Sequence, residues 1–574
     1  MSDPNLPPIS LVLCWHMHQP WYREREDGDY RLPWVYLHAL KDYVDMAAHL
    51  EAHPRMRCVV NFTPVLLEQL DDYAIQFRQH LDSGSRFCEP LLNLLAGVDE
   101  IPSDKESRAD IVRACRRAHA PLMIDVHPRF RALFDMVMQA DGEHIDESRL
   151  DYMSEQFFLD LLVWYHLAWL GYSLKQLPRV RGMLDNDGVF DQTARRRLLE
   201  IMSEAFDGLL ERYRALADSG QIELSMTPYG HPIVPLLIDI DSMRCALPGA
   251  PVPEGSAYPD GLERARWHMR EGLRVFEHYL GRRPQGVWLS EGGVSAEALQ
   301  LLDEFDISWS ASGEGVWNNS RVLSAMESDD EEARRSLFCA HTLADCKTRL
   351  FFRDDGLSDL IGFEYQQWNA DDAAADFRQH LSNIAQFLGD DCSDHVVSVI
   401  LDGENAWEYY PDNAFHFLGA LYDQLSDSEQ VNTITFSEAL EVCPPQPLPA
   451  LCPGSWVYGS FSTWIGETDK NRAWELLIEA KQTYDKVVTG KRFDAARLHQ
   501  LERQLAICEG SDWFWWFGDY NPADSVSDFD RLFRLQLTNL YELLDEPAPP
   551  SLAQPISVGG GQVDNAGTMR RGHG

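Results

Sequence analysis

The feature that most limits what this chain can fold into is an alternation of short apolar runs with segments of helical periodicity. The run ISLVLCW at 9–15 is followed by apolar residues at helical spacing over 37–50. Further strand-like runs are RCVVNF, IELSM, GVWLSE, ISWSAS, RLFF, VVSVIL and NTITF. Continuous apolar strands that alternate with helices predict an α/β fold with a parallel sheet covered by helices, either a barrel or an open doubly wound sheet.

Three stretches depart from this alternation. Residues from about 65 to 210 are mostly helical in pattern, which predicts an insertion within a larger domain over 1–445. The proline-rich joint CPPQPLPALCPG at 443–454 precedes another helical part, so we expect a separate helical subdomain over 446–545. Residues 546–574 are rich in Pro, Gly and polar residues, a composition that predicts a disordered tail.

Charge excludes some partners. The 50 Lys and Arg against 91 Asp and Glu give a net charge of -41, which disfavours nucleic acid and anionic membrane surfaces. The first residues lack a cationic, apolar signal pattern, so we expect a cytoplasmic protein. The apolar stretch at 157–172 contains Asp160 and His166 and is shorter than the roughly 20 residues of a membrane span, so it predicts a buried helix.

The cysteines suggest neither a disulfide framework nor a zinc site. There are 11 of them, scattered and without a C-x-x-C pair, so we expect reduced thiols in the core. No oligomeric state is indicated.

Polar residues at the ends of the predicted strands are the candidates for function. His16 and His18 are two apart on a strand, so they face the same side and could bind a metal or a sugar, or form a satisfied histidine pair. Glu223 interrupts an apolar run, where a carboxylate needs a partner or a function. Glu291 follows an apolar run directly, and Asp402 ends the most apolar strand of the chain.

Two carboxylates at the ends of two parallel strands fit the cleavage of a glycosidic bond. That reaction needs one carboxylate to attack or to activate water, and one carboxylic acid to protonate the leaving oxygen. Aromatic rings, whose flat faces pack against sugars, are frequent in the same loops. These residues are Trp15, Trp21, Trp288, Trp407, Tyr409, Tyr410 and the cluster SDWFWWFGDY at 511–520.

Five ordered motifs resemble those of the family 57 glycoside hydrolases, over about residues 9 to 520. HMHQP is similar to the first motif and implies that His16, His18 and Gln19 bind sugar. GQIELSMTPYGHPIVPLL resembles the second, with Glu223 and His231 as site residues.

The other motifs imply the catalytic pair. WLSE resembles the third motif, which makes Glu291 the nucleophile, and LDGEN the fourth, which makes Asp402 the acid/base. SDWFWW resembles the fifth and implies substrate contacts. The further substrate-binding residues that we expect from these and neighbouring segments are Trp288, Arg353, Trp407, Trp464, Asp512 and Trp513.

This resemblance implies an incomplete (β/α)7 barrel with a helical insertion, followed by a helical bundle that completes the active site. It implies a retaining enzyme that acts on α-glucans such as starch, glycogen or maltodextrin, with no cofactor and no metal. SDWFWW and GHPIVPLL are more similar to the amylase and amylopullulanase members than to the transferases, so hydrolysis is the preferred interpretation.

Other interpretations stay open. A 4-α-glucanotransferase or a branching enzyme would use the same motifs with a glucan as acceptor. A zinc-dependent α-mannosidase or carbohydrate deacetylase would use the H-x-H pair as metal ligands. A non-catalytic glucan-binding protein would keep the aromatic residues without the chemistry, and a scaffold protein would use the acidic surface and the helical insertion to bind a partner.

Overall fold

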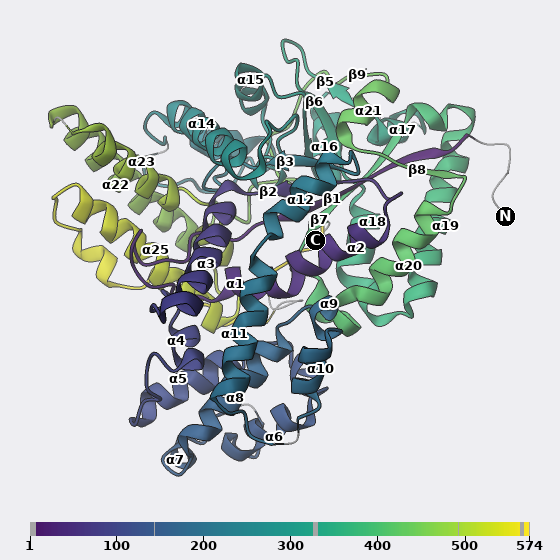
Figure 1. Ribbon diagram of the computed structural model, residues 1–574. Helices are drawn as coiled ribbons and strands as arrows, with labels where there is room; N and C mark the ends of the chain where they lie inside the picture. Colours follow the sequence, from purple (N-terminus) through teal and green to yellow (C-terminus); the bar gives the residue numbers. More distant parts are fainter. Residues whose placement is uncertain are drawn as a thin grey trace.

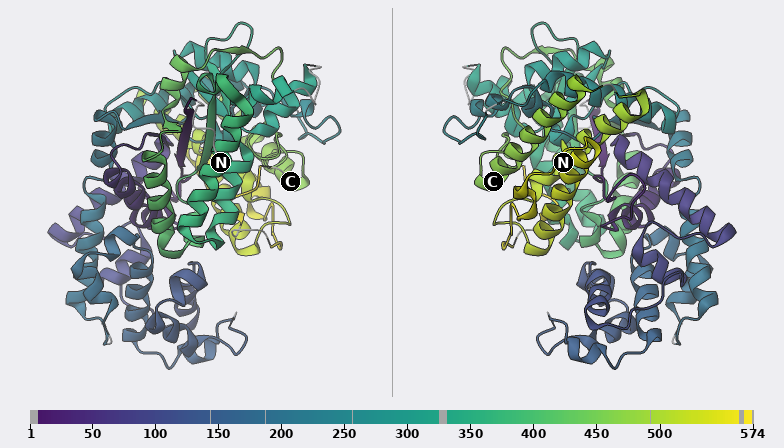
Figure 2. Two further views of the ribbon diagram at one scale, coloured as in Figure 1. Left: turned by 90° about the vertical axis from the view of Figure 1, so that its right-hand side faces the viewer. Right: turned by 90° about the vertical axis from the view of Figure 1, so that its left-hand side faces the viewer.

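The computed structural model describes residues 7–142, 144–186, 188–255, 257–324, 331–491, 493–562 and 567–572. It is an α/β fold in which strands lie at the centre and helices surround them (Figure 1). The views at right angles show the helices between about 90 and 206 as a lobe that extends below the strands (Figure 2), and the last long helices lie beside the strands, at the left of Figure 1.

The central sheet has five strands and is entirely parallel. β1 (Ile9–Met17) lies between β2 (Cys58–Phe62) and β7 (Val396–Asp402), and β3 (Ile222–Met226) pairs with β2. β8 (Val431–Thr433) pairs with the first residues of β1. Every residue of β1 and β2 is buried, which explains why these strands read as continuous apolar runs.

A second, smaller sheet continues from β3. In it β4 (Trp309–Ser312) runs parallel to β6 (Arg349–Phe352), and β5 (His341–Thr342) joins β6 to β9 (Gln446–Pro447). Residues 286–287 connect the two sheets by parallel bridges, one between Met226 and Val287 and one between Gly286 and Trp309. Beyond the end of β6, the Asp354 amide donates a hydrogen bond to the Ser398 carbonyl of β7.

The predicted strands are confirmed in position. Seven of the eight apolar runs form β1, β2, β3, β4, β6, β7 and β8, and GVWLSE forms only the two bridges. The short strands β5 and β9 were not predicted, because each has only two residues and shows no periodicity.

The segment between β2 and β3 forms helices joined by loops, with one isolated bridge among its described residues, in agreement with the mostly helical pattern predicted for 65–210. The apolar stretch at 157–172 forms a buried helix, with His166 fully enclosed and hydrogen-bonded to Tyr36. The helices of this segment are α3 (Pro64–Ser83), α4 (Pro90–Ala96), α5 (Lys105–Cys115), α6 (Pro128–Val137), α7 (Glu147–Leu150), α8 (Glu155–Ala168), α9 (Tyr172–Lys175), α10 (Pro178–Leu184), α11 (Gln192–Phe206) and α12 (Leu209–Asp218).

Other helices connect the strands and cover the sheets. They are α1 (Trp34–His38), α2 (Val44–Ala52), α13 (Val234–Ile238), α14 (Gly261–Leu280), α15 (Ala296–Glu304), α16 (Glu314–Leu323), α17 (Glu331–Arg335), α18 (Asp355–Asp359), α19 (Ala370–Leu388), α20 (Phe415–Ser426) and α21 (Phe436–Val442).

The region after the proline-rich joint is again helical. Its helices are α22 (Thr468–Gly490), α23 (Ala495–Cys508), α24 (Asp512–Trp516) and α25 (Ala523–Leu543), and α25 contacts the other three. Their aromatic side chains pack together, for example Trp474 on Phe514 and Trp513 on Phe533.

The prediction of a disordered tail is wrong for the described residues after 545. Leu552 and Ser557 are buried, and Ser557 accepts a hydrogen bond from the Gly518 amide. Further on, the Gly567 carbonyl accepts from Trp515, and the Arg570 guanidinium lies over Trp515 at 4.9 Å. Composition predicted disorder because the tail has few apolar residues of its own, but it packs on an apolar surface that the helices supply. Residues 563–566 and 573–574 lie outside the described part.

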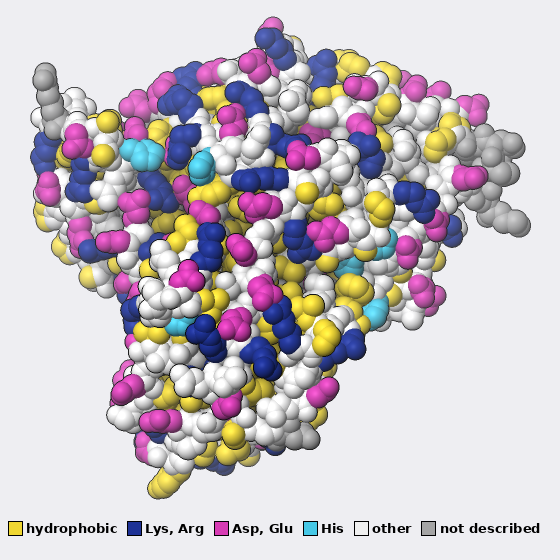
Figure 3. All heavy atoms as spheres, viewed as in Figure 1, with side chains coloured by type: hydrophobic (Ala, Val, Ile, Leu, Met, Phe, Trp, Pro, Cys, Tyr) yellow, Lys and Arg dark blue, Asp and Glu magenta, His cyan; other side chains and the backbone are white. Residues whose placement is uncertain are grey.

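The surface carries both signs of charge. On the face shown in Figure 3, Lys and Arg side chains are scattered among Asp and Glu rather than gathered in one patch. None of the helices in the described part of the chain combines the length and the apolarity that a bilayer crossing requires.

Candidate active site

The candidate site lies where the central strands end. His16 is in register with Asn61 of β2 on one side and with Asp402 of β7 on the other. Because parallel strands present their carboxyl ends at the same edge, residues far apart in the sequence meet here. Asn61 was not predicted as a site residue, although it is the last residue but one of its strand, as His16 is of β1.

Three imidazoles meet at this edge. His16 Nε2 lies 3.2 Å from His231 Nε2, and the rings of His18 and His231 are stacked with centroids 3.6 Å apart. On the outer side, His16 Nδ1 donates to Asn61 Oδ1 at 2.7 Å, and His231 Nδ1 accepts from the Ser511 hydroxyl at 2.8 Å. The sequence prediction that His16, His18 and His231 share a site is therefore matched by their positions.

Of the three imidazoles, the buried His16 and His231 favour the neutral form. Burial, reinforced by the neighbouring His18, lowers the pKa of His16 to about 3, and burial lowers the pKa of His231 well below its ordinary value. His18 is half-buried, and its Nε2 donates to Asp512 Oδ1 at 2.8 Å. Asp512 comes from α24, so the C-terminal helical region contributes directly to the cluster.

Glu291 stands in a strained turn. Its φ of 59° and ψ of 24° are left-handed, a conformation that costs a non-glycine residue about 1–3 kcal/mol. Gly292 follows with a φ of 58°, where a Cβ would meet the Trp288 ring at 2.8 Å. Strain of this kind is held in place where surrounding contacts fix the residue, and such positions concentrate at functional sites.

Trp456 fixes Glu291. Its indole Nε1 donates to Glu291 Oε2 at 3.0 Å, and its backbone amide donates to the Glu291 carbonyl at 3.1 Å. The Trp456 ring also packs edge-on against Trp288, with centroids 5.2 Å apart. The sequence predicts Trp464 as a site residue, whereas Trp456, eight residues earlier, was not predicted.

Glu291 and Asp402 interact electrostatically. Burial raises the pKa of Asp402 to about 6, against the opposing effects of Asn405, His18 and Arg353. Burial also raises the pKa of Glu291 well above its ordinary value, and the Asp402 charge raises it further. Two carboxyls coupled in this way titrate as a pair, because ionisation of one disfavours ionisation of the other. Both are half-buried, so they face an accessible space.

Arg353 is buried and held in place by protein groups. It donates to Asp355 Oδ1 at 2.7 Å, to Asp359 Oδ1 at 2.9 Å and to the Ile400 carbonyl of β7 at 3.1 Å. Its guanidinium lies 5.0 Å from the Trp456 ring centroid. Arg353 therefore lies beside the pair, where it lowers the pKa of Asp402 and supports Trp456.

Gln19 and Glu404 form a hydrogen-bonded group with the backbone of His18. Glu404 was not predicted as a site residue. Glu404 is buried, and its Oε1 accepts from the His18 amide at 3.1 Å and from Gln19 Nε2 at 3.3 Å. Gln19 Oε1 in turn accepts from Tyr22. Burial and the Asp402 charge raise the pKa of Glu404 well above its ordinary value. The second carboxylate in LDGEN was the signal that could have identified it.

Three of the predicted aromatic residues are core residues. Trp407 donates to the Gly403 carbonyl and packs against Trp15, and Trp513 donates to the Ile507 carbonyl among aromatic neighbours. Trp464 is fully buried against Trp515. Burial of both faces leaves these rings no surface for a sugar. Trp288, also buried, lies beside the cluster, with its ring centroid 6.4 Å from that of His16.

Glu223 lies at the opposite end of the sheet. It is the second residue of β3, and its carboxylate accepts from Trp309 Nε1 at 2.7 Å and from the Ser437 hydroxyl and amide at 2.7 and 2.9 Å. The expectation that Glu223 belongs to the site is therefore not matched. The motif that contains it reaches the site through His231, eight residues later.

The three histidines also meet the distance requirement for a metal ion. One ligand atom from each of His16, His18 and His231 lies within 4.8 Å of the others. However, the rings are nearly parallel, with interplanar angles of 14° to 17°, and His18 Nε2 is engaged by Asp512. A metal needs lone pairs that converge on one point, so the rings would have to rotate to bind it.

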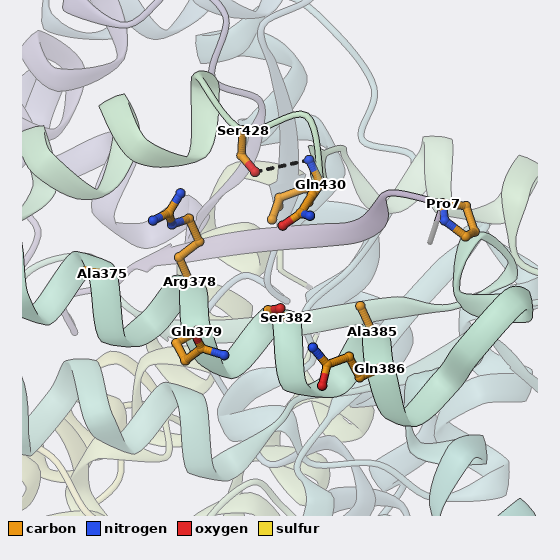
Figure 4. Close-up of a pocket in the computed structure, with 10 residues that line it drawn as sticks. Pro7, Ala375, Arg378, Gln379, Ser382, Ala385, Gln386, Ser428 and Gln430 are labelled. Atoms are coloured by element: carbon orange, nitrogen blue, oxygen red, sulfur yellow. Dashed lines mark hydrogen bonds between the residues drawn. The ribbon is translucent and has the colours of Figure 1, made fainter. Parts of the chain in front are cut away.

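Two pockets lie away from this cluster. One, with an empty volume of about 1090 Å³, lies between the loop at 21–27 and helices α23 and α25, with Trp21, Arg503 and Glu542 in its lining. The other lies between α19 and the loop carrying Ser428 and Gln430 (Figure 4). Neither is lined by Glu291 or Asp402.

Comparison with known proteins gives one sequence family and several related structures. The sequence model of glycosyl hydrolase family 57 matches residues 12–451. No curated protein matches the chain in sequence.

Three solved structures are similar over most of this chain. A branching enzyme from Pyrococcus horikoshii has a TM-score of 0.57 at 16% identity and covers 97% of this chain and 98% of its own. The α-amylase AmyC from Thermotoga maritima has a TM-score of 0.57 at 13% identity, with coverage of 94% and 93%. A 4-α-glucanotransferase from Thermococcus litoralis has a TM-score of 0.50 at 15% identity and covers 93% of this chain and 60% of its own. At these identities the likeness concerns the fold.

Proposed function

The chain belongs to glycosyl hydrolase family 57, and from that premise we propose that it is a retaining glycosidase that hydrolyses α-glucans such as starch, glycogen or maltodextrin. The observation that carries the proposal is the coupled pair of Glu291 and Asp402 at the carboxyl end of the sheet. Each carboxyl has a raised pKa, and the Asp402 charge contributes to the shift of Glu291, so the two groups are coupled as double displacement at an anomeric carbon requires.

Glu291 is proposed as the nucleophile. Its strained backbone and the hydrogen bond from Trp456 fix the carboxylate in one orientation. In the first step Glu291 attacks the anomeric carbon while Asp402 gives its proton to the leaving glycosidic oxygen. The reactive form of the pair therefore has its proton on Asp402, and the resulting covalent glycosyl-enzyme is released when Asp402 removes a proton from water.

The imidazole cluster is proposed to bind the sugar beside this pair. Asp512 Oδ2 makes no hydrogen bond with any described residue, although it is enclosed by protein, and can accept one from a sugar hydroxyl. His18, which Asp512 orients, lowers the pKa of Asp402 and so lies next to the reacting groups.

We propose that the strands form the incomplete (β/α)7 barrel of a catalytic domain over 1–445. The parallel neighbours run from β7 through β1, β2 and β3 to residues 286–287, then to β4 and β6. The hydrogen bond from the Asp354 amide, just after β6, to the Ser398 carbonyl of β7 connects β6 to β7. The helical region over 446–545 is proposed as the bundle that completes the site, since it brings Asp512 to His18.

The products formed from glucans distinguish hydrolysis from the transfer of a glucan chain to another glucan. Incubation with soluble starch, maltooligosaccharides and pullulan, followed by chromatography, should give shorter maltooligosaccharides with a matching rise in reducing ends. Longer linear products would indicate a 4-α-glucanotransferase, and new α-1,6 branches without new reducing ends a branching enzyme. Glucan binding without any product would support a non-catalytic protein.

A zinc-dependent hydrolase, such as an α-mannosidase or a deacetylase, is the second candidate, because the three histidines are close enough for a metal ion. The two-carboxylate reaction needs none, so enzyme treated with EDTA and desalted should keep its activity on α-glucans. Activity that is lost and then restored by zinc would overturn the proposed mechanism and make His16, His18 and His231 metal ligands.

A further inference from the structure

Cys245 and Cys452 are close in space, although 207 positions separate them in the sequence. Their Sγ atoms are 3.0 Å apart, closer than the roughly 3.5 Å of an ordinary heavy-atom contact. Cys245 is exposed at the end of the turn Ile240–Cys245, and Cys452 is buried in the proline-rich joint. We infer that Cys245 and Cys452 form an oxidative modification site, at which a low-molecular-weight disulfide such as oxidised glutathione joins them covalently.

The surroundings of the two thiols favour movement of Cys245. The Cys452 amide donates to Ser320 at 2.9 Å, and Gly454 pairs with Val294 through two backbone hydrogen bonds. A disulfide needs the sulfurs about 2.05 Å apart, a shift of about 1 Å. Because the joint is held on both sides of Pro453, the exposed Cys245 makes this shift.

The two thiols react in separate steps, because Cys245 is accessible and Cys452 is buried. The Cys245 thiolate attacks one sulfur of oxidised glutathione, and the first glutathione thiolate leaves. The Cys452 thiol then loses its proton and attacks the Cys245 sulfur, and the second glutathione leaves. Two thiols are oxidised, one glutathione disulfide is reduced, and two protons pass to the two glutathione thiolates. Burial and the neighbouring Cys245 raise the pKa of Cys452 to about 12, so the second step is the slower one.

The cross-link would join two segments that lead to the candidate site. Cys245 follows α13, which begins three residues after His231, and Cys452 lies four residues before Trp456. Since the joint itself stays in place, we expect the Trp456–Glu291 hydrogen bonds to persist and the activity of the oxidised protein to remain within about twofold of the reduced protein. A cross-link over so long a loop should also raise the melting temperature by a few degrees.

The test treats the full-length protein with oxidised glutathione and measures the intact mass and the peptide map. The expected product has lost two hydrogen atoms and contains a peptide that joins Cys245 to Cys452, and dithiothreitol reverses the change. Cys452→Ser should instead trap one glutathionyl group on Cys245, and Cys245→Ser should prevent the cross-link. Cys346→Ser, at a half-buried thiol elsewhere in the chain, is the control and should react like the wild type.

A stable glutathionyl adduct on Cys245 of the wild-type protein, a cross-link to another cysteine, or no reaction at all would overturn the inference. The mass measurement does not depend on the reaction that the site catalyses. A failed glucan assay would therefore count against the proposed function and leave the modification site standing.

Discussion

The two ends of the parallel sheet each contain a half-buried carboxylate, and the contrast between their hydrogen-bond partners supports a structural role at one end and the proposed catalytic role at the other. At the amino end, Glu223 accepts three hydrogen bonds from Trp309 and Ser437. At the carboxyl end, one side-chain donor faces Glu291, the indole of Trp456, and one faces Asp402, the amide of Asn405. Burial alone thus does not mark a catalytic group. The hydrogen-bonding capacity that Glu291 and Asp402 leave open toward an accessible space is what supports their proposed catalytic roles.

Backbone strain follows the same division. Glu291 and His231, both at the carboxyl end, have positive φ values of 59°, whereas Glu223 lies in a regular strand. Strained positions cost stability, so the contacts around Glu291 and His231 must hold the backbone in these conformations.

The largest expected effect is that of Glu291→Gln. This change keeps the shape of the side chain but removes the nucleophilic charge, so kcat on maltooligosaccharides should fall at least about 10³-fold. Glu223→Gln is the matched control at the other end and should keep kcat within about twofold. An equal loss in both variants would show that the two ends do not differ in the way proposed.

Asp402→Asn should reduce kcat on natural glucans by about 10²- to 10⁴-fold, because both proton transfers are lost. An aryl α-glucoside with a good leaving group needs no proton in the first step, so its glycosyl-enzyme should accumulate. Added azide should then release an α-glycosyl azide. A β-configured azide would contradict retention of configuration, and the absence of any intermediate would remove Asp402 from the acid/base role.

Trp456→Phe should have an intermediate effect, with kcat/KM lower by about tenfold. The change removes the indole hydrogen bond that stabilises the ionised Glu291, so the pKa of Glu291 should rise further. In the wild type, kcat/KM should fall on the acid side, where Glu291 becomes protonated, and this acid limb should move to higher pH in the variant. A pH profile that does not move would assign Trp456 a packing role only.

The smallest effects concern the free energy of unfolding, which should change in opposite directions in Asp402→Asn at the carboxyl end and Glu223→Gln at the amino end. The folded-state pKa of Asp402, about 6, lies above its unfolded value, so the folded protein binds more protons and its stability falls as pH rises from about 4 to about 6. Asp402→Asn removes this loss and should stabilise the protein at pH 7 by about 1–2 kcal/mol. Glu223→Gln turns an amide group toward a donor of Ser437 or Trp309 and should destabilise it by about 1–3 kcal/mol.

Melting temperatures at pH 4 and pH 7 measure this comparison. The gain in Asp402→Asn should be present at pH 7 and vanish near pH 4, where the wild-type carboxyl is protonated. A destabilised Asp402→Asn variant at pH 7 would contradict the direction of the pKa shift.

Much of the site could be predicted from residues that end apolar runs. His16, Asp402 and Glu291 each follow or terminate a strand-like segment, and the register of parallel strands brings them to one edge. Glu223 was misjudged because a carboxylate within a strand shows no sign of which end of the sheet it occupies. Trp407 and Trp513 were misjudged because an aromatic side chain reads the same in sequence whether its faces are covered or free.

The sequence by itself determined most of the strands and the family, since these depend on local patterns of apolar and polar residues. Only the tertiary structure decided the partners: Trp456 beside Glu291, Asp512 beside His18, and Arg570 of the supposed tail over Trp515. Each of these contacts joins segments more than 50 residues apart and gains its energy from burial in a shared interior. No periodicity within one segment records such a contact, so it is settled only when the chain packs.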